Sequence, residues 1–170
     1  GRLPTFPASG GSASPERPGR GIGQNGGMRV RIDPELKALA SGRRILAAGA
    51  SPEGQVVGLV DRLLFHDATG VRQQPWHQIE RGSWDEASRT LSWLDAAGTS
   101  WRLELTETGR LPDLFNERVT ASIACVRVVE LNPGSAVITA RRDLADVTAA
   151  LVWRVAPGPG TTAGTVAASP

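Results

Sequence analysis

The stretch that decides the fold is residues 71–105, VRQQPWHQIERGSWDEASRTLSWLDAAGTSWRLEL. Four of the five tryptophans of the chain lie in it, at Trp76, Trp84, Trp93 and Trp101, so they follow one another at intervals of 8, 9 and 8 residues. Such an interval is about the length of a short strand plus a turn, so a large apolar side chain returns once per strand. The spacing predicts an antiparallel β-meander.

The first turn of this meander sets the register of its first two strands. Trp84 can pair with Leu91 across residues 85–90, which close the turn. Gly82 then lies opposite Trp93, whose indole can cover a residue that has no side chain.

The second turn sets the next pair of strands. Pairing Trp93 with Trp101 leaves residues 96–98 as a three-residue loop, with Gly98 at the position that requires a positive φ. The period of two places five apolar side chains on one buried face: Leu91, Trp93, Trp101, Leu103 and Leu105. The opposite face is expected to be exposed to solvent, and it carries Thr90, Ser92, Arg102 and Glu104.

The flanking segments predict further strands and two helices. Asp33 is expected to cap a short helix that has Pro34 in its first turn and stops at Ser41 and Gly42. Apolar residues at helical spacing predict a longer helix over residues 111–124. The other expected strands are residues 44–50, 55–60, 63–66, 71–74, 126–131, 136–140 and 151–156.

The two ends of the chain differ in composition from the middle. Residues 1–27 are rich in Gly, Pro, Ser and Arg, and such a segment buries too little apolar surface to offset its ordering entropy. We therefore expect a disordered tail over residues 1–27, a single domain over residues 28–156 and a disordered tail over residues 157–170. Two interpretations of the first tail are open: Met28 is the true start of the protein, or the tail is native.

The formal net charge of +2 comes from the N-terminal tail. This tail holds three arginines and one glutamate, so the other residues hold 16 basic and 16 acidic side chains. A neutral domain argues against a strongly basic nucleic-acid-binding face. The single cysteine, Cys125, excludes a disulfide framework and favours a reducing, cytoplasmic location.

The order of elements resembles a pleckstrin-homology-like (PH-like) fold, in which antiparallel strands are closed off by one amphipathic helix. The sequence is similar to the bacterial PH-like and GRAM-like group. There, a strand leads into a tight Asp-Arg turn (here residues 59–64, LVDRLL), and a glycine turn precedes a Pro-aromatic-x-x-Ile segment (here residues 75–79, PWHQI). The block through Arg118 also resembles an uncharacterised actinobacterial family with a later Trp-Asp, here Trp84-Asp85.

This resemblance spans about residues 43–124. It implies a mainly β (α+β) fold, an antiparallel PH-like barrel or roll with one capping helix. Residues 126–156 depart from the minimal fold and add an extra C-terminal hairpin and strand.

Four residues form the candidate interaction surface: Arg43, Arg44, Arg72 and Trp76. PH-like domains bind anionic head groups near their first strands, and Trp76 follows a proline outside the regular alternation. The alternative is that these arginines, with Arg62, are solvated surface residues balanced by nearby carboxylates: Glu53, Asp61 and Asp67. The Arg141-Arg142 pair, next to Asp143 and Asp146, has the same interpretation.

No catalytic, metal-binding or cofactor-binding residue is assigned. The two histidines, His66 and His77, stand in no metal-ligand spacing, and the chain holds no P-loop or dinucleotide fingerprint. An enzyme would be recognised by a cleft in which one histidine meets a carboxylate. Cys125, expected at a helix C-terminus, is not favoured as a thiolate there.

We therefore predict a non-enzymatic binding module of PH-like type that contacts a protein partner, with a homodimer as one form of that contact. An anionic membrane surface is the alternative partner, and nucleic acid is disfavoured. Because a PH-like fold hosts many unrelated functions, two more functions stay open: a small-ligand carrier that uses the barrel interior, and an enzyme with an unrecognised site.

Overall fold

A computed structural model describes residues 31–132 and 134–158 of the chain. The described strands form three antiparallel sheets, in which strands that follow one another in sequence lie side by side. Sheet A contains β1 (Ile45–Ser51), β2 (Gly54–Leu59), β3 (Arg62–Asp67) and β4 (Gly70–Pro75). Sheet B contains β5 (Ile79–Asp85), β6 (Thr90–Asp95) and β7 (Ser100–Glu104). Sheet C contains β8 (Ile123–Glu130), β9 (Ser135–Arg141) and β10 (Val152–Pro157).

Two α-helices, α1 (Pro34–Ala40) and α2 (Leu111–Ser122), and the short 3₁₀ helix η1 (Trp76–Gln78) complete the described elements. The predicted mainly β architecture with one longer helix and additional C-terminal strands is confirmed. Within the described residues the strands form three separate sheets and do not close into a barrel. Of the two predicted tails, the first lies outside the described residues. The second lies outside them except for Pro157, which ends β10, and Gly158, whose N–H donates to the carbonyl of Ser135 at 2.8 Å.

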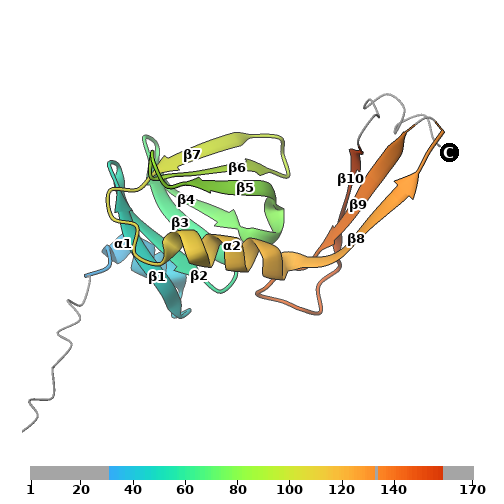
Figure 1. Cartoon of the computed structure of the whole chain (residues 1–170). Helices are drawn as coiled ribbons and strands as arrows, with labels where there is room; N and C mark the ends of the chain where they lie inside the picture. The colour runs from blue at the N-terminus through green and yellow to red at the C-terminus, as the bar shows by residue number, and fades with distance from the viewer. Residues whose placement is uncertain (1–30, 133, 159–170) are drawn as a thin grey trace, which may run out of the picture.

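Sheets A and B and the helices form a body, and sheet C projects from it as an arm (Figure 1). We use "body" for residues 31–122 and "arm" for β8, β9 and β10. The arm begins where α2 ends, because Ser122 is the last helical residue and Ile123 already has extended φ and ψ angles.

The meander in sheet B has the predicted registers. Trp84 pairs with Leu91, Gly82 with Trp93, and Trp93 with Trp101. Gly98 has a φ of 84°, as the three-residue loop requires. The tryptophan spacing was therefore sufficient to fix the pairing of all three strands.

Of the meander tryptophans, Trp76 and Trp93 are buried in the core, and Trp84 and Trp101 are half-buried and pack against it. The rings of Trp93 and Trp101 stack with their centroids 6.0 Å apart, and Phe65 of sheet A meets both rings edge-on at 5.5 and 5.7 Å. One residue expected on the solvent-exposed face is an exception: Thr90 is buried, and its hydroxyl donates to the carbonyl of Ser88 at 3.0 Å.

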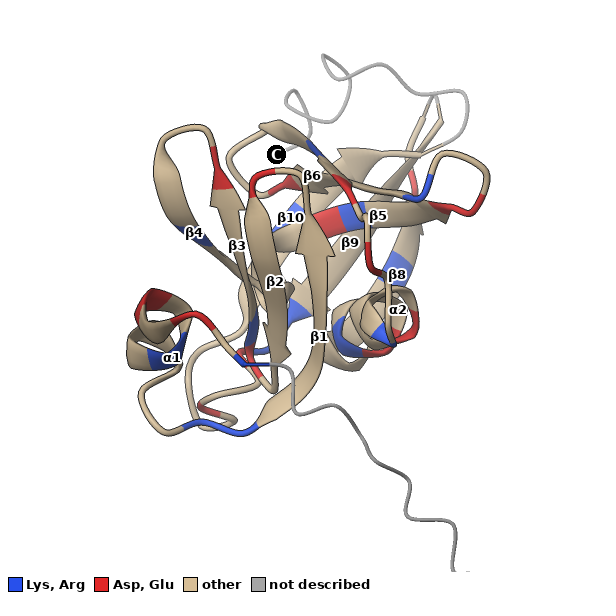
Figure 2. Ribbon diagram, turned by 90° about the vertical axis from the view of Figure 1, so that its left-hand side faces the viewer, with Lys and Arg blue, Asp and Glu red and all other residues tan. Residues whose placement is uncertain are grey.

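Helix α2 packs closely against both sheets of the body (Figure 2). A Cβ atom on Gly82 would lie 2.4 Å from Cε1 of Phe115, and one on Gly58 would lie 2.3 Å from Cδ2 of Leu114. These glycines let the helix approach the strands, because any side chain would collide with it. The close contact at Gly82 is thus with Phe115 of the helix, rather than with the indole of Trp93 as expected from the sequence.

Helix α2 ends two residues before the predicted end at residue 124. Ile123 pairs with Arg141 across sheet C, and the carbonyl of Ser122 accepts the backbone N–H of Arg142 at 2.8 Å. Pairing in sheet C therefore ends the helix at Ser122, and Ile123 belongs to the first strand of the arm. Helix periodicity did not show this, because Ile123 fits both patterns.

The short helix α1 has the predicted cap. The carboxylate of Asp33 accepts the backbone N–H of Glu35 at 2.8 Å, and the helix ends at Ser41 with a φ of 50°. Leu36 and Ala40 are buried in a second, smaller core cluster, on Val57, Leu59 and Leu64 of sheet A.

Candidate functional site

The structure does not place Trp76 at the surface, so the prediction that it contacts a partner is wrong. Its side chain is 0% exposed, and its Nε1–H donates to the carbonyl of Leu59 at 3.0 Å. The extended conformation of Pro75 turns the chain inward, and the backbone N–H of Trp76 donates to the carbonyl of Asp61. The break in alternation at Pro75 marks a 3₁₀ turn into the core.

Two of the three predicted arginines are paired with carboxylates. Arg72 Nε donates to Asp67 Oδ2 at 2.5 Å, and Arg43 Nη1 lies 3.5 Å from Asp61 Oδ2. Asp61 also accepts from Arg62 at 2.6 Å. The Arg72–Asp67 pair supports the interpretation as balanced surface charge, whereas Asp61 is a buried carboxylate that binds Arg43 and Arg62. Arg44 is exposed beside Arg43, directly before β1.

The Asp67 carboxyl shows the effect of this pairing. A hydrogen bond from the Thr69 hydroxyl, followed by one from Arg72, lowers the pKa of Asp67 from 3.8 to about 2. Acidic and basic residues are interspersed along the elements seen in Figure 2. The guanidinium of Arg72 is therefore already engaged by an ionised partner.

His77 lies within ion-pair distance of a carboxylate, and neither histidine hydrogen-bonds to a carboxylate within the described residues. His77 Nδ1 lies 3.7 Å from Asp143 Oδ1, which is too far for a hydrogen bond. His66 lines a cleft of about 320 Å³ together with Glu53 and Glu104, and makes no hydrogen bond to either. The described residues include no group of three or more His, Cys, Asp or Glu side chains placed to hold a metal ion.

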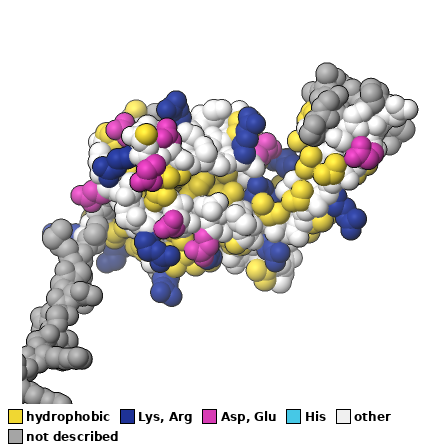
Figure 3. All heavy atoms as spheres, in the orientation of Figure 1, with side chains coloured by type: hydrophobic (Ala, Val, Ile, Leu, Met, Phe, Trp, Pro, Cys, Tyr) yellow, Lys and Arg dark blue, Asp and Glu magenta, His cyan; other side chains and the backbone are white. Residues whose placement is uncertain are grey.

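The arm exposes most of the surface hydrophobic side chains of the described chain. Of the eight large hydrophobic residues that are exposed there, seven lie in the arm or its β9–β10 connection: Val126, Val128, Val129, Val147, Leu151, Trp153 and Val155. Trp153 is 58% exposed and Val155 is 55% exposed. Figure 3 shows hydrophobic side chains gathered along the arm.

The two faces of the arm differ. Register pairs Trp153 with Ala140 and Val155 with Ile138, and residues paired in this way share a face. We call this face, which includes Trp153, Val155 and Ile138, the outer face. The alternate residues Val137, Thr139 and Arg154 line a cleft of about 270 Å³ against sheet B, so the other face looks toward the body. Val155 of the outer face also lines this cleft, whereas Trp153 does not.

Arg141 joins the arm to the body, contrary to the interpretation of the Arg141-Arg142 pair as solvated. Its side chain is 5% exposed. Nη1 donates to the carbonyl of Val119 at 3.1 Å and to Ser122 Oγ at 2.7 Å, and Nη2 donates to the carbonyl of Glu80 at 2.9 Å.

Burial lowers the pKa of Arg141, and the carboxylate of Glu80 opposes this shift. All three hydrogen-bond acceptors of Arg141 are neutral, so its charge is not matched by a direct ion pair. Sequence reasoning missed this role because an Arg-Arg pair flanked by aspartates has the same composition as a solvated turn.

Comparisons with protein families, with curated proteins and with solved structures find no significant match for this chain. The predicted membership of a PH-like group therefore stays a prediction. The α-helices of the described residues have seven and twelve residues, and neither is long and apolar enough to cross a membrane. The candidate site is thus the arm, argued from its own surface.

Proposed function

We propose that this chain is a non-enzymatic protein-interaction module of PH-like type, and that the outer face of the arm is its contact surface. The order of elements in the body supports the PH-like part of the proposal: four antiparallel strands, then three, then one helix. The single cysteine supports a cytoplasmic location.

The observation that carries the proposal is the exposure of Trp153 and Val155 on the outer face. A tryptophan buries roughly 150–250 Å² when it is covered, so an indole that is 58% exposed offers about 100 Å² or more of apolar surface. Hydrophobic residues scattered singly over a surface need no explanation, whereas a patch of this kind indicates a contact. Tryptophan is also among the residues that contribute most to protein–protein affinity.

The arm offers backbone as well as side chains to a partner. Within the described residues, β8 and β10 each pair only with β9, so each leaves one edge of hydrogen-bonding groups unpaired. A protein can use such an edge, whereas a membrane cannot. The pairing of Arg43 and Arg72 with carboxylates also disfavours the anionic-membrane alternative.

The experiment compares affinity capture from the native host by the wild-type chain and by a Trp153→Ser/Val155→Ser variant. Val60→Ser, which alters the exposed hydrophobic residue in the body, is the matched control. Light scattering on the same three proteins reports self-association. We expect a captured protein, or a second copy of the chain, with wild type and Val60→Ser and not with the arm variant.

Two results would overturn the proposal. The first is an identical set of captured proteins and an identical mass for wild type and arm variant. The second is binding of the wild type to vesicles of anionic lipid that depends on Trp153, which would assign the arm to a membrane surface.

A further inference from the structure

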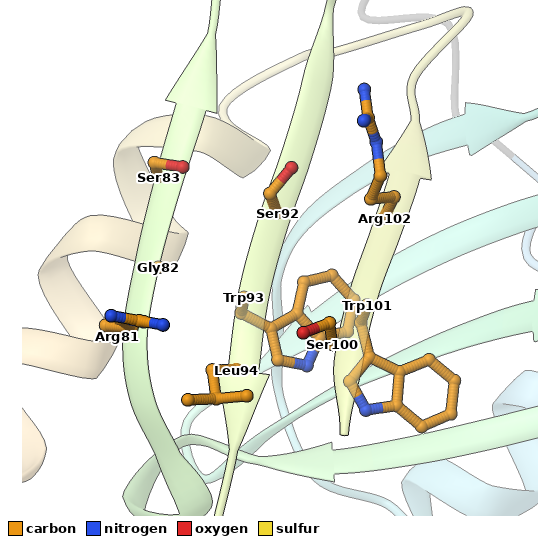
Figure 4. A pocket seen from close by; sticks show the side chains of 9 residues that line it. All are labelled: Arg81, Gly82, Ser83, Ser92, Trp93, Leu94, Ser100, Trp101 and Arg102. Atoms are coloured by element: carbon orange, nitrogen blue, oxygen red, sulfur yellow. The ribbon is translucent and has the colours of Figure 1, made fainter. Parts of the chain in front are cut away.

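A groove crosses the body side of the arm, away from the outer face. One cleft of about 400 Å³ lies over the outward side of sheet B, where its lining includes Arg81, Leu94 and Arg102 (Figure 4). The cleft of about 270 Å³ between sheet B and the arm is lined by Arg81 and Leu94 as well. The two clefts are neighbours that share these residues, and we call them together the arm-base groove.

The charges that line the arm-base groove are mostly positive. Its arginines are Arg81, Arg102, Arg141 and Arg154, and Glu80 is its one carboxylate. Glu80 already forms an ion pair with Arg154, since its Oε1 lies 3.3 Å from Arg154 Nε. The lining of these two clefts is therefore net positive, and Glu53, Asp67 and Glu104 line an adjoining cleft on the other side of Arg102.

Two of these arginines are available to a ligand. Arg81 is exposed and makes no ion pair or hydrogen bond within the described residues. Arg102 is exposed as well and makes no ion pair within the described residues. Hydrogen bonds from Ser88 and Ala87, and to a smaller extent the charge of Arg102, lower the pKa of the nearby Asp85 carboxyl. The groove can thus receive carboxylates at two points without first breaking an ion pair.

The positions of Arg81 and Arg102 favour an extended ligand over a small anion. Arg81 is on β5 and Arg102 is on β7, with β6 between them. Measured along the strands, Arg102 is displaced from Arg81 by two residues. Two strand spacings and one two-residue step separate their backbones by roughly 12 Å. An extended peptide rises about 3.3 Å per residue and its side chains alternate between two sides, so carboxylates four residues apart point the same way and match this separation.

The surface between the two arginines suits a peptide backbone and apolar side chains. Ser83, Ser92 and Ser100 line the same cleft and offer hydroxyl groups (Figure 4). Leu94 lies where the two clefts meet, and Val137 of the arm faces it across the groove. A charged ligand with no apolar part would leave the side chains of Leu94 and Val137 uncovered.

We propose that the arm-base groove binds an extended acidic peptide segment of a partner protein, with carboxylates four residues apart and an apolar residue midway between them. Arg81 and Arg102 bind the carboxylates, and Leu94 and Val137 contact the apolar side chain. This site uses the face of the arm opposite to Trp153, so it is a second contact and does not depend on the proposed function of the outer face.

The test measures fluorescence anisotropy of a labelled peptide, Thr-Glu-Thr-Val-Thr-Glu-Thr-Val-Thr-Glu, with the full chain at low ionic strength. The comparison peptide has Gln in place of each Glu. We expect binding of the Glu peptide alone, weakened by added salt because exposed charges are screened. Arg81→Glu/Arg102→Glu should weaken it by about tenfold or more, because each reversed charge repels the peptide.

The control variants separate this groove from general charge effects and from the outer face. Arg127→Glu makes the same charge change on an exposed residue of the arm outside the groove and should change the affinity by less than about twofold. Trp153→Ser should leave peptide binding unchanged. Retained peptide binding with loss of the captured partner would separate the two surfaces.

Three results would overturn the proposal. One is equal binding of the Gln and Glu peptides, and another is an equal loss of binding in Arg127→Glu and in the groove variant. The third is tighter binding of a short oligothymidylate with the same dependence on Arg81 and Arg102, which would assign the groove to single-stranded nucleic acid. Circular dichroism of each variant confirms that a loss of binding is not a loss of folding.

Discussion

Replacing the buried Arg141 by methionine should destabilise the protein and loosen the arm. The guanidinium makes hydrogen bonds of 3.1, 2.7 and 2.9 Å to acceptors on α2 and β5. Hydrogen bonds to a charged group stabilise the folded state by about 1.5–3 kcal/mol each. Methionine is uncharged, so the variant avoids the cost of desolvating the guanidinium, which offsets several kcal/mol of this loss. We therefore expect Arg141→Met to lower the free energy of unfolding by about 3 kcal/mol.

Urea unfolding followed by tryptophan fluorescence measures this change. Arg142→Met is the matched control, because Arg142 is the next residue and is exposed. It should change the free energy of unfolding by less than about 0.5 kcal/mol. A loss below about 1 kcal/mol for Arg141→Met, or an equal loss in both variants, would refute the role assigned to Arg141.

Three further predictions follow from contacts elsewhere. Gly82→Ala should lower the free energy of unfolding in urea by about 1–3 kcal/mol, because its Cβ would overlap the ring of Phe115. The Asp67 carboxyl should titrate near pH 2 by ¹³C NMR, and in Thr69→Ala its pKa should rise toward 3.8. Because the folded-state pKa is the lower one, the stabilisation from Asp67 is present above about pH 4 and is lost as the pH falls toward 2. Trp153→Ser should change the free energy of unfolding by less than about 0.5 kcal/mol, since the side chain is exposed, and a larger loss would contradict its placement.

Local signals in the sequence were sufficient for the pairing in sheet B. Trp84, Trp93 and Trp101 occur at strand spacing, and Gly98 supplies the positive φ that the three-residue loop with a bulge requires. The helix cap at Asp33 could likewise be predicted from the sequence, because its hydrogen-bond partner, the backbone N–H of Glu35, is only two residues away. Features set by neighbours in the chain were therefore predicted well.

Features set by distant parts of the chain were not predicted. Trp76 is buried because the carbonyls of Leu59 and Asp61 receive its N–H groups, and nothing near Trp76 in the sequence reveals these acceptors. Arg141 is buried by contacts that reach 61 residues back, to Glu80. For the outer face, alternation in β10 predicted an apolar side and could not show that this side lies outside the core.

The projecting arm has a consequence for how the molecule opens and closes in solution. Both core clusters draw their buried residues from positions 36–115, so sheet C contributes no residue to the clusters that hold the body together. Segments with few buried apolar contacts open at a lower free energy than the core, often as one cooperative unit. Amide hydrogens in β8, β9 and β10 should therefore exchange with solvent before those of β2 and β6, and a bound partner should slow exchange in the arm first. The arm is in this sense a less stable unit that Arg141 joins to the body, and a partner bound to the arm should slow its opening.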